Sequence, residues 1–252
     1  MRLTVVGCSG SFPGPASPAS CYLIEAAHEG GTFRLVLDLG SGALGYLQRY
    51  VALESVDAVI LSHLHADHCL DMCSFYVVRK YNPSGPMQVL PVYGPEGTGD
   101  RIARAYDLPS GAAMSNQFDF RGFPDQTFAL GPFQVSVALV DHPVAAYAIK
   151  LVDAGRTLVY SGDTALCTSL ERFAEGADVL LAEASFLDAS DNPGHLHMTG
   201  KEAASVAQRA RVRELVLTHI PPWHSPDVVL AEAAPHFAGL SSLARQGGVF
   251  EI

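Results

Sequence analysis

The stretch His63-Leu64-His65-Ala66-Asp67-His68 places three imidazoles and one carboxylate within six residues. It follows the apolar run 57–62, which predicts a strand that ends where the histidines begin. His63 and His65 lie two residues apart, so in extended backbone their side chains point to the same side. Asp67 and His68 follow where the chain must turn, so they can point toward a second position nearby. One short loop can therefore supply ligands to two metal ions.

An alternative interpretation of this stretch is a polar turn whose histidines share no role. A group this dense has little structural use, because buried imidazoles and carboxylates without partners cost free energy. Imidazole and carboxylate ligands are typical of zinc, manganese or iron sites rather than of thiolate-bound ions. We therefore expect two divalent metal ions per chain, zinc first, with manganese or iron as alternatives. We do not expect the adjoining Cys69 to be a ligand.

Three later strand ends carry further candidate ligands. His142 follows the run 133–141, Asp163 follows 157–162, and His219 follows 214–218. The hexapeptide, together with a His, an Asp and a His in this order, resembles the HxHxDH pattern of the metallo-β-lactamase superfamily over essentially the whole chain. The resemblance implies an α/β fold, the four-layer αββα sandwich, as one domain over residues 1–252. It places the metal site at one edge between the two sheets.

The resemblance also implies a role for each candidate ligand. The first metal takes His63, His65 and His142, the second takes Asp67, His68 and His219, and Asp163 bridges them. Such a site holds a bridging water whose pKa falls to near neutrality, so that it can act as the nucleophile. Asp38 matches an acid after the third strand that orients the histidine loop through hydrogen bonds. The alternative for Asp38 is an aspartate in a turn.

Two further segments resemble the RNase Z branch of this superfamily. Residues 182–185 and 197–199 look like its paired His-Glu-Ala-Thr and His-Ser-Thr segments, with Ala182 and Met198 as departures. In that branch the Glu and the His donate a proton to the leaving oxygen, which implies this role for Glu183 and His197. A carboxylate raises the pKa of a neighbouring imidazole. We therefore expect Asp67, Glu183 and His197 to act in catalysis; the alternative for the last two is a surface loop.

Four residues are candidate substrate contacts. Ser9 and Ser11 lie in a glycine-rich loop that resembles the first loop of the RNase Z branch, where backbone N–H groups can line an anion site. Tyr147 follows the His142 segment, and the single tryptophan, Trp223, follows His219. The alternatives are a plain turn for the serines, a core position for Tyr147, and packing or a subunit contact for Trp223.

The net charge and the short segment between His142 and Asp163 indicate what size of substrate to expect. The formal net charge is −10 and Arg79-Lys80 is a lone basic pair, so general nucleic-acid binding is not favoured. RNase Z enzymes carry a long arm before the bridging Asp, whereas only two strands and a tight turn fit between His142 and Asp163 here. The segments at 7–11, 17–20, 65–71 and 217–223 resemble RNase-Z-like cyclic nucleotide phosphodiesterases of actinobacteria.

We therefore expect a metal-dependent phosphodiesterase acting on a small substrate, with 3′,5′-cyclic AMP hydrolysed to 5′-AMP as the first expectation. The alternative enzyme is an RNase Z-like endonuclease that processes the tRNA 3′ end. A metal-bearing binding protein without catalysis is a third hypothesis, and the Glu183/His197 pair argues against it. The RNase Z branch is commonly dimeric, so by analogy we expect a homodimer.

The remaining expectations concern the chain as a whole. It has 252 residues, of which 48% are hydrophobic, enough for the core of one large domain. Its five cysteines form no CxxC pair, so we expect buried thiols in a reducing compartment. No apolar run reaches about 18 residues, and residues 1–8 are interpreted as a strand rather than a signal, so we expect a cytoplasmic protein without a membrane span.

The hydrophobic pattern predicts strands that alternate with helices. An irregular excursion is expected over 107–126, at the rim of the active site. Hairpin turns are expected at 29–31 and 154–155, and a capping box at 199–202. The expected strands are 2–7, 20–26, 33–39, 57–62, 88–94, 132–141, 146–153, 156–161, 178–183, 214–219 and 247–251, and the expected helices are 42–51, 67–81, 96–107, 166–174, 199–211 and 226–237.

Overall fold

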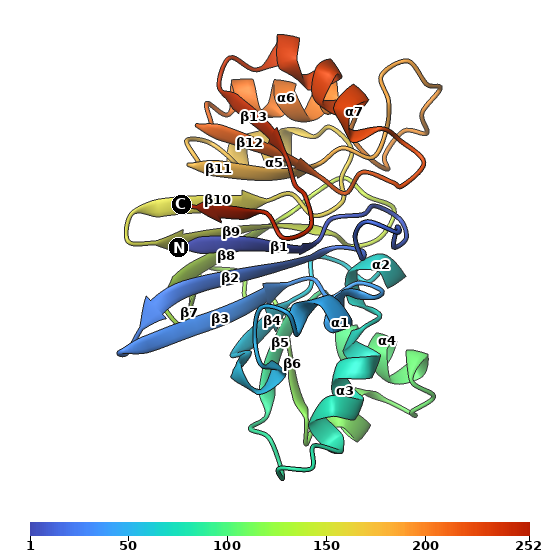
Figure 1. The fold of residues 1–252 in the computed structure, drawn as a ribbon, viewed down its shortest axis with the longest axis vertical. Coiled ribbons are helices and arrows are strands. Elements are labelled where there is room, and N and C mark those ends of the chain that lie inside the picture. The colour runs from blue at the N-terminus through green and yellow to red at the C-terminus, as the bar shows by residue number, and fades with distance from the viewer.

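The computed structural model describes residues 1–252 and contains two seven-stranded mixed sheets (Figure 1). In order across the first sheet, the strands are β14 (Val249–Glu251), β1 (Arg2–Gly7), β2 (Cys21–His28), β3 (Gly31–Leu37), β4 (Ala58–Ile60), β5 (Leu90–Gly94) and β6 (Phe118–Gly122). Across the second sheet they are β13 (Leu240–Leu243), β12 (Glu214–Thr218), β11 (Val179–Glu183), β10 (Arg156–Tyr160), β9 (Tyr147–Asp153), β8 (Phe133–Leu139) and β7 (Phe128–Leu130).

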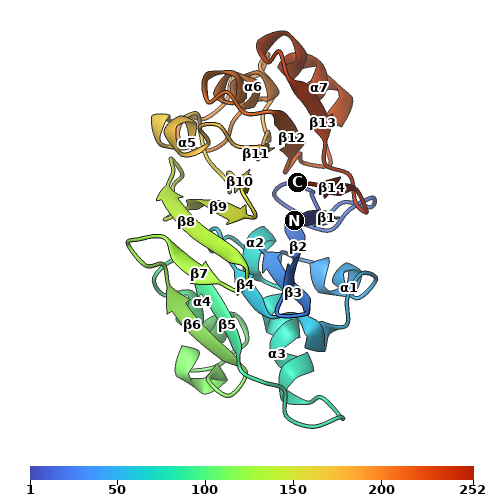
Figure 2. The ribbon, with the colours of Figure 1, turned by 90° about the vertical axis from the view of Figure 1, so that its left-hand side faces the viewer.

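Helices cover the outer face of each sheet, as Figure 2 shows. On the first sheet lie α1 (Ala43–Leu47), α3 (Met72–Lys80) and α4 (Thr98–Ala105), and on the second lie α5 (Thr168–Phe173), α6 (Gly200–Arg209) and α7 (Pro226–Ala233). The short helix α2 (Ala66–Cys69) follows the histidine loop. One apolar core fills the space between the sheets, and two more lie under the helices. The predicted αββα sandwich is confirmed.

The three cores explain why the central strands are apolar at almost every position. In β3, Leu35 and Leu37 face the core between the sheets, while Val36 faces the core under the helices. Strands buried on both faces show continuous apolar runs rather than alternation. The tight turns at Glu29–Gly30 and Ala154–Gly155 have positive φ angles at both residues, the backbone of two-residue hairpins. Both predicted hairpins and the capping box of α6 are present.

Several elements differ from the sequence expectation. The stretch 107–126, expected to be irregular, contains β6, because Phe118 is buried against the helices and β6 pairs in parallel with β5. β7 and β13 have three and four residues, too short for a detectable pattern. The expected helix 67–81 is two helices, because the chain breaks at Asp71, whose carboxylate accepts from Leu44 N. None of the helices is long and apolar enough to cross a membrane.

Candidate metal centre

The candidate ligands come from loops that follow parallel strands. β3 and β4 are parallel in the first sheet, and β10, β11 and β12 are parallel in the second. The carboxyl ends of parallel strands meet at one edge of a sheet, and here the edges of both sheets face each other. Asp38, His63, Asp163 and His219 each follow one of these ends, on the side where α2 lies in Figure 1.

Four side chains form the first ligand group. The nitrogen Nδ1 of His65 lies 3.1 Å from Nε2 of His63 and 3.1 Å from Nε2 of His142. Asp163 Oδ2 lies 3.7 Å from His63 Nε2. Each residue offers one ligand atom, and these atoms all lie within 4.8 Å of one another.

The second group shares Asp163 with the first. His68 Nε2 lies 3.0 Å from His219 Nε2 and 3.2 Å from Asp163 Oδ1. Asp67 Oδ2 lies 3.0 Å from His219 Nε2. The two oxygens of Asp163 thus reach both groups, which is the geometry that a bridging ligand requires. The structure brings together all seven residues predicted as metal ligands.

The hydrogen bonds of His68 and His219 fix which nitrogen faces the centre. His68 Nδ1 donates to the Asp38 carboxylate at 2.7 Å, which leaves Nε2 pointing into the centre. Ser185 Oγ donates to the His219 carbonyl oxygen, so it accepts from His219 Nδ1 at 2.8 Å. Both histidines therefore point Nε2 into the centre, the nitrogen through which each would bind a metal.

The first group has the same arrangement. His142 Nδ1 donates to the Leu196 carbonyl oxygen at 2.8 Å. His63 Nδ1 donates to Ser62 Oγ at 3.1 Å, because that hydroxyl gives its own hydrogen to a buried carboxylate. His65 differs, since its Nδ1 faces the other two imidazoles. Three ring nitrogens thus converge on one point, where a cation would accept a lone pair from each of them.

Charge and burial fit a pair of divalent cations. Burial alone would raise the pKa of Asp163, but the imidazoles of His219 and His68 hold it well below its usual range. Burial lowers the pKa of His63 and keeps that imidazole neutral. Asp163 Oδ1 is buried and has no hydrogen-bond partner. A buried carboxylate oxygen without a partner is costly, and a cation at this position would satisfy it.

Asp38 orients residues of this centre through hydrogen bonds. Its carboxylate accepts hydrogen bonds from Ser62 N at 2.6 Å, Ser62 Oγ at 2.8 Å, His68 Nδ1 at 2.7 Å and Tyr160 Oη at 2.7 Å. The side chain is completely buried, and its backbone has a φ of 56°. Asp38 thus connects the loop that carries His63 to the ring of His68, the role expected of it.

We expect Asp38→Asn to lower metal affinity about 10- to 100-fold, the usual cost of losing such a partner. Asparagine fits the volume and tolerates the positive φ, so the fold should persist. Competition with a fluorescent chelator measures the affinity. Asp57→Asn is the matched control, because Asp57 accepts from Arg34 N at an exposed position. Unchanged affinity in Asp38→Asn would contradict the orienting role.

Glu183 and His197 form a second functional pair beside the centre. His197 Nδ1 lies 2.8 Å from Glu183 Oε1 and 4.0 Å from Asp163 Oδ2. Glu183 is completely buried, and it also accepts from Thr164 N at 2.9 Å. Burial alone would lower the pKa of His197, but the Glu183 carboxylate outweighs it and raises the pKa to about 9. His197 can therefore hold a proton at neutral pH with Nε2 free to donate it.

The partners of the ligands were not predicted from the sequence. Ser185 and Tyr160 touch His219 and Asp38 through contacts between distant segments, so no local pattern indicates them. His195 is 84% exposed and pairs with Asp141 outside the centre. Cys69 is buried in the core under the helices, and its Sγ donates to the Leu64 carbonyl oxygen. The expectation that Cys69 is not a ligand agrees with this placement.

The four candidate substrate contacts differ in what they touch. Ser11 N points toward His219 Nε2 at 3.4 Å, whereas Ser9 Oγ donates to the Ser17 carbonyl oxygen and holds its own loop. Trp223 is 63% exposed and lies against Phe12 with ring centroids 4.8 Å apart. Tyr147 is half-buried at the start of β9, and its N–H donates to the carbonyl oxygen of Ser62, the residue before His63.

The comparisons with known proteins agree with this geometry. A family model described as beta-lactamase superfamily domain matches residues 34–220. An uncharacterized protein of Mycobacterium leprae is 46% identical over 100% of this chain and 89% of its own length. The probable metallo-hydrolase YhfI of Bacillus subtilis is 32% identical over 100% of both chains.

The crystal structure of YhfI superposes with a TM-score of 0.88 at 33% identity, covering 100% of this chain and 99% of that one. Ribonuclease Z of Myxococcus xanthus is 26% identical over 100% of this chain and 98% of its own length. The residues matched by the family model include every strand end that carries a candidate ligand. This chain therefore belongs to the metallo-β-lactamase superfamily, in its RNase Z-like branch.

Proposed function

We propose that this metallo-hydrolase cleaves small phosphodiesters, and that it converts 3′,5′-cyclic AMP to 5′-AMP. The observation that carries the proposal is the pair formed by His197 and Glu183 next to the bridging Asp163. A thiolate leaves a thioester without this assistance, whereas a ribose alkoxide is a poor leaving group that needs a proton. An acid positioned beside two metal groups therefore favours phosphodiester hydrolysis.

The side chains of the site divide the reaction between them. When bound, two divalent ions supply a hydroxide at neutral pH and offset the charge on the phosphoryl oxygens. Glu183 holds the His197 ring through Nδ1, so that Nε2 carries the proton to be donated. The bond from phosphorus to O3′ breaks as the bond to the incoming oxygen forms. The His197 proton moves to O3′, which gives the 5′ monophosphate with a free 3′ hydroxyl.

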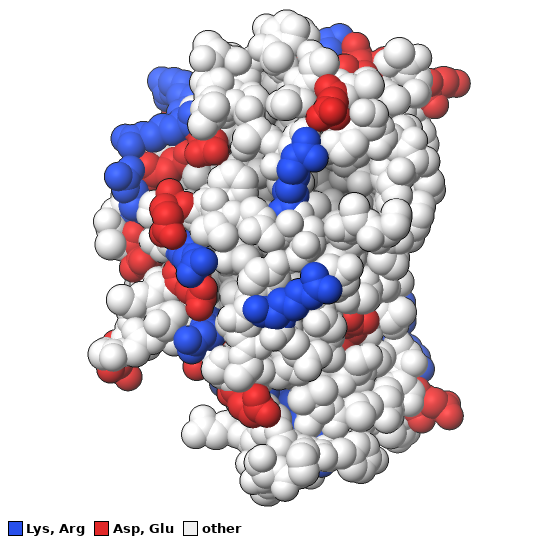
Figure 3. Space-filling view, viewed as in Figure 1, with Lys and Arg blue, Asp and Glu red and all other residues white.

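Size and charge support a small substrate rather than an RNA. Only the hairpin of β9 and β10 lies between the His142 loop and Asp163, and it leaves no room for an inserted arm. On the face drawn in Figure 3, Lys and Arg side chains mix with Asp and Glu along the left edge. No continuous basic patch leads to the side where α2 lies. A net charge of −10 opposes long-range attraction of a polyanion.

A parallel assay tests the proposal against its main competitor, an endonuclease that processes the tRNA 3′ end. We expect kcat/KM for cyclic AMP to exceed that for a tRNA precursor at matched metal and salt concentrations. Cyclic GMP and 2′,3′-cyclic nucleotides complete the substrate set, and His63→Ala serves as the inactive control. Efficient cleavage at the tRNA 3′ end with negligible hydrolysis of cyclic AMP would overturn the proposal in favour of the endonuclease.

A further inference from the structure

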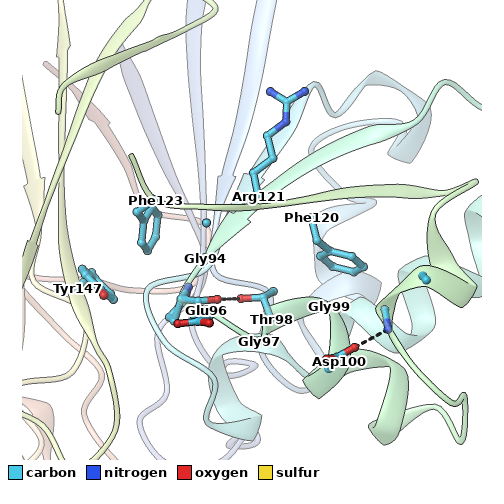
Figure 4. A pocket seen from close by; sticks show the side chains of 14 residues that line it. Gly94, Glu96, Gly97, Thr98, Gly99, Asp100, Phe120, Arg121, Phe123 and Tyr147 are labelled. Carbon is cyan, nitrogen blue, oxygen red and sulfur yellow. Dashed lines mark hydrogen bonds between the residues drawn. The ribbon is translucent and has the colours of Figure 1, made fainter. Parts of the chain in front are cut away.

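We infer that a cleft between the β5–α4 loop and the end of β6 receives the nucleoside of the substrate, an inference that rests on the proposed function. The cleft has a volume of about 560 Å³, enough for a nucleoside (Figure 4). It is built from four separate segments of the chain. The lining residues are Gly94 to Asp100, Gly111, Ala112, Phe120 to Phe123, and Tyr147.

One end of this nucleoside cleft adjoins the metal centre through the backbone. Tyr147 N donates to the carbonyl oxygen of Ser62, the residue before the ligand His63, at 3.1 Å. Gly162, the residue before Asp163, packs so closely that a Cβ there would lie 2.9 Å from the Tyr147 carbonyl oxygen. The start of β9 is thus held between the two loops that carry these ligands. This adjacency supports the inference that a group bound at the metals extends past Tyr147 into the nucleoside cleft.

Aromatic rings line the nucleoside cleft. The rings of Phe123 and Tyr147 lie with centroids 4.9 Å apart, and both side chains are half-buried. Figure 4 shows them at one end of the cleft and Phe120 toward the other. A planar base gains from contact with such rings, because stacking on an aromatic face is worth about 1–3 kcal/mol per base. The half-exposed faces of these rings suit a bound ring rather than a closed core.

The charges in the nucleoside cleft decide which part of the substrate enters. Arg121, its single basic residue, pairs with Asp119 and Tyr93 and points away from Phe120 and Phe123 in Figure 4. The remaining charges are the carboxylates of Glu96 and Asp100, which repel a phosphate. The phosphate therefore stays at the metals and the uncharged nucleoside faces the rings.

Glu96 supplies the polar contact. Its side chain is exposed. Figure 4 draws two hydrogen bonds, one from Thr98 to Pro95 and one from Gly111 to Asp100, and Glu96 takes part in neither. An ionised carboxylate only accepts hydrogen bonds, so it selects a ligand that carries a donor. On a nucleoside such donors are the 2′ hydroxyl and the exocyclic amine of the base. The nucleoside cleft thus recognises a ring and a nearby donor together.

Binding of 5′-AMP to the metal-loaded protein tests this assignment without requiring turnover. We expect Phe123→Ala and Glu96→Gln each to weaken 5′-AMP binding about tenfold, while the affinity for inorganic phosphate stays the same. Phe123→Tyr keeps the ring and should restore binding. Tyr81→Ala is the matched aromatic control, because Tyr81 is 64% exposed at the end of α3. Calorimetry gives both dissociation constants.

Two ligand analogues identify the donor that faces Glu96. If the donor is the 2′ hydroxyl, 2′-deoxy-AMP binds wild type and Glu96→Gln with equal affinity. If the donor is the exocyclic amine, the 5′ monophosphate of unsubstituted purine riboside binds the two proteins with equal affinity. Equal weakening of 5′-AMP and phosphate in the variants, or weakening of neither, would contradict the nucleoside cleft. Loss of 5′-AMP binding only in Trp223→Leu would move the base to the Phe12–Trp223 pair. If wild type binds 5′-AMP in this way but does not hydrolyse cyclic AMP, the result contradicts the proposed function and leaves the nucleoside cleft in place.

Discussion

Asp163→Asn should reduce phosphodiester hydrolysis by at least about 10³-fold, because it removes the bridging charge on which both ligand groups depend. Together the two oxygens of Asp163 reach ligands of both groups, and the neighbouring imidazoles stabilise its ionised form. A neutral amide keeps the volume of the carboxylate but offers only one acceptor atom. Elemental analysis of the purified variant should show loss of metal in parallel with the loss of activity.

Asp107→Asn provides the matched control for this experiment. Asp107 is exposed after α4 and has a φ of 63°, which asparagine tolerates. The control should keep full activity and metal content. If Asp163→Asn keeps both as well, Asp163 does not bridge the two metals.

His197→Ala should slow hydrolysis of cyclic AMP about 10²- to 10⁴-fold without removing metal, as expected for loss of a general acid. The ring lies beside the centre but none of its hydrogen bonds runs to a metal ligand. The loss should be much smaller for bis-p-nitrophenyl phosphate, because p-nitrophenolate leaves with little need for a proton. Steady-state kinetics on the two substrates, with metal analysis of the same samples, measures the difference.

His195→Ala is the neighbouring control, since His195 is an exposed imidazole on the same loop. It should leave both rates within a small factor of wild type. Equal losses on both substrates in His197→Ala would show that His197 is not the acid. In that case the Glu183 contact would serve to hold the loop in place.

The strand ends that carry candidate ligands could be predicted from local pattern, whereas the fold and the grouping of the ligands were implied by the resemblance to the superfamily. Buried parallel strands have continuous apolar runs, and the polar residue that follows each run lies at the shared edge of the sheets. His63, Asp163 and His219 follow this rule, which is why strand ends indicated the centre. The αββα architecture and the superfamily, which the resemblance implied, are confirmed.

Contacts between distant segments could not be predicted in this way. Tyr160 reaches Asp38 across 122 residues of sequence, and Ser185 orients His219 from the neighbouring strand end. The edge strands β6, β7 and β13 are short, so their pairing is decided by the neighbouring strand rather than by their own pattern. The nucleoside cleft could not be predicted from the sequence, because its four segments meet only after both sheets form.

Anomalous scattering from crystals of the metal-loaded protein tests the central claim most directly. The account predicts two peaks per chain, one among His63, His65 and His142 and one among Asp67, His68 and His219, with Asp163 between them. Elemental analysis of the same preparation should give two divalent ions per chain. A single peak in fully loaded protein, or a peak coordinated by Cys69, would contradict the dinuclear centre.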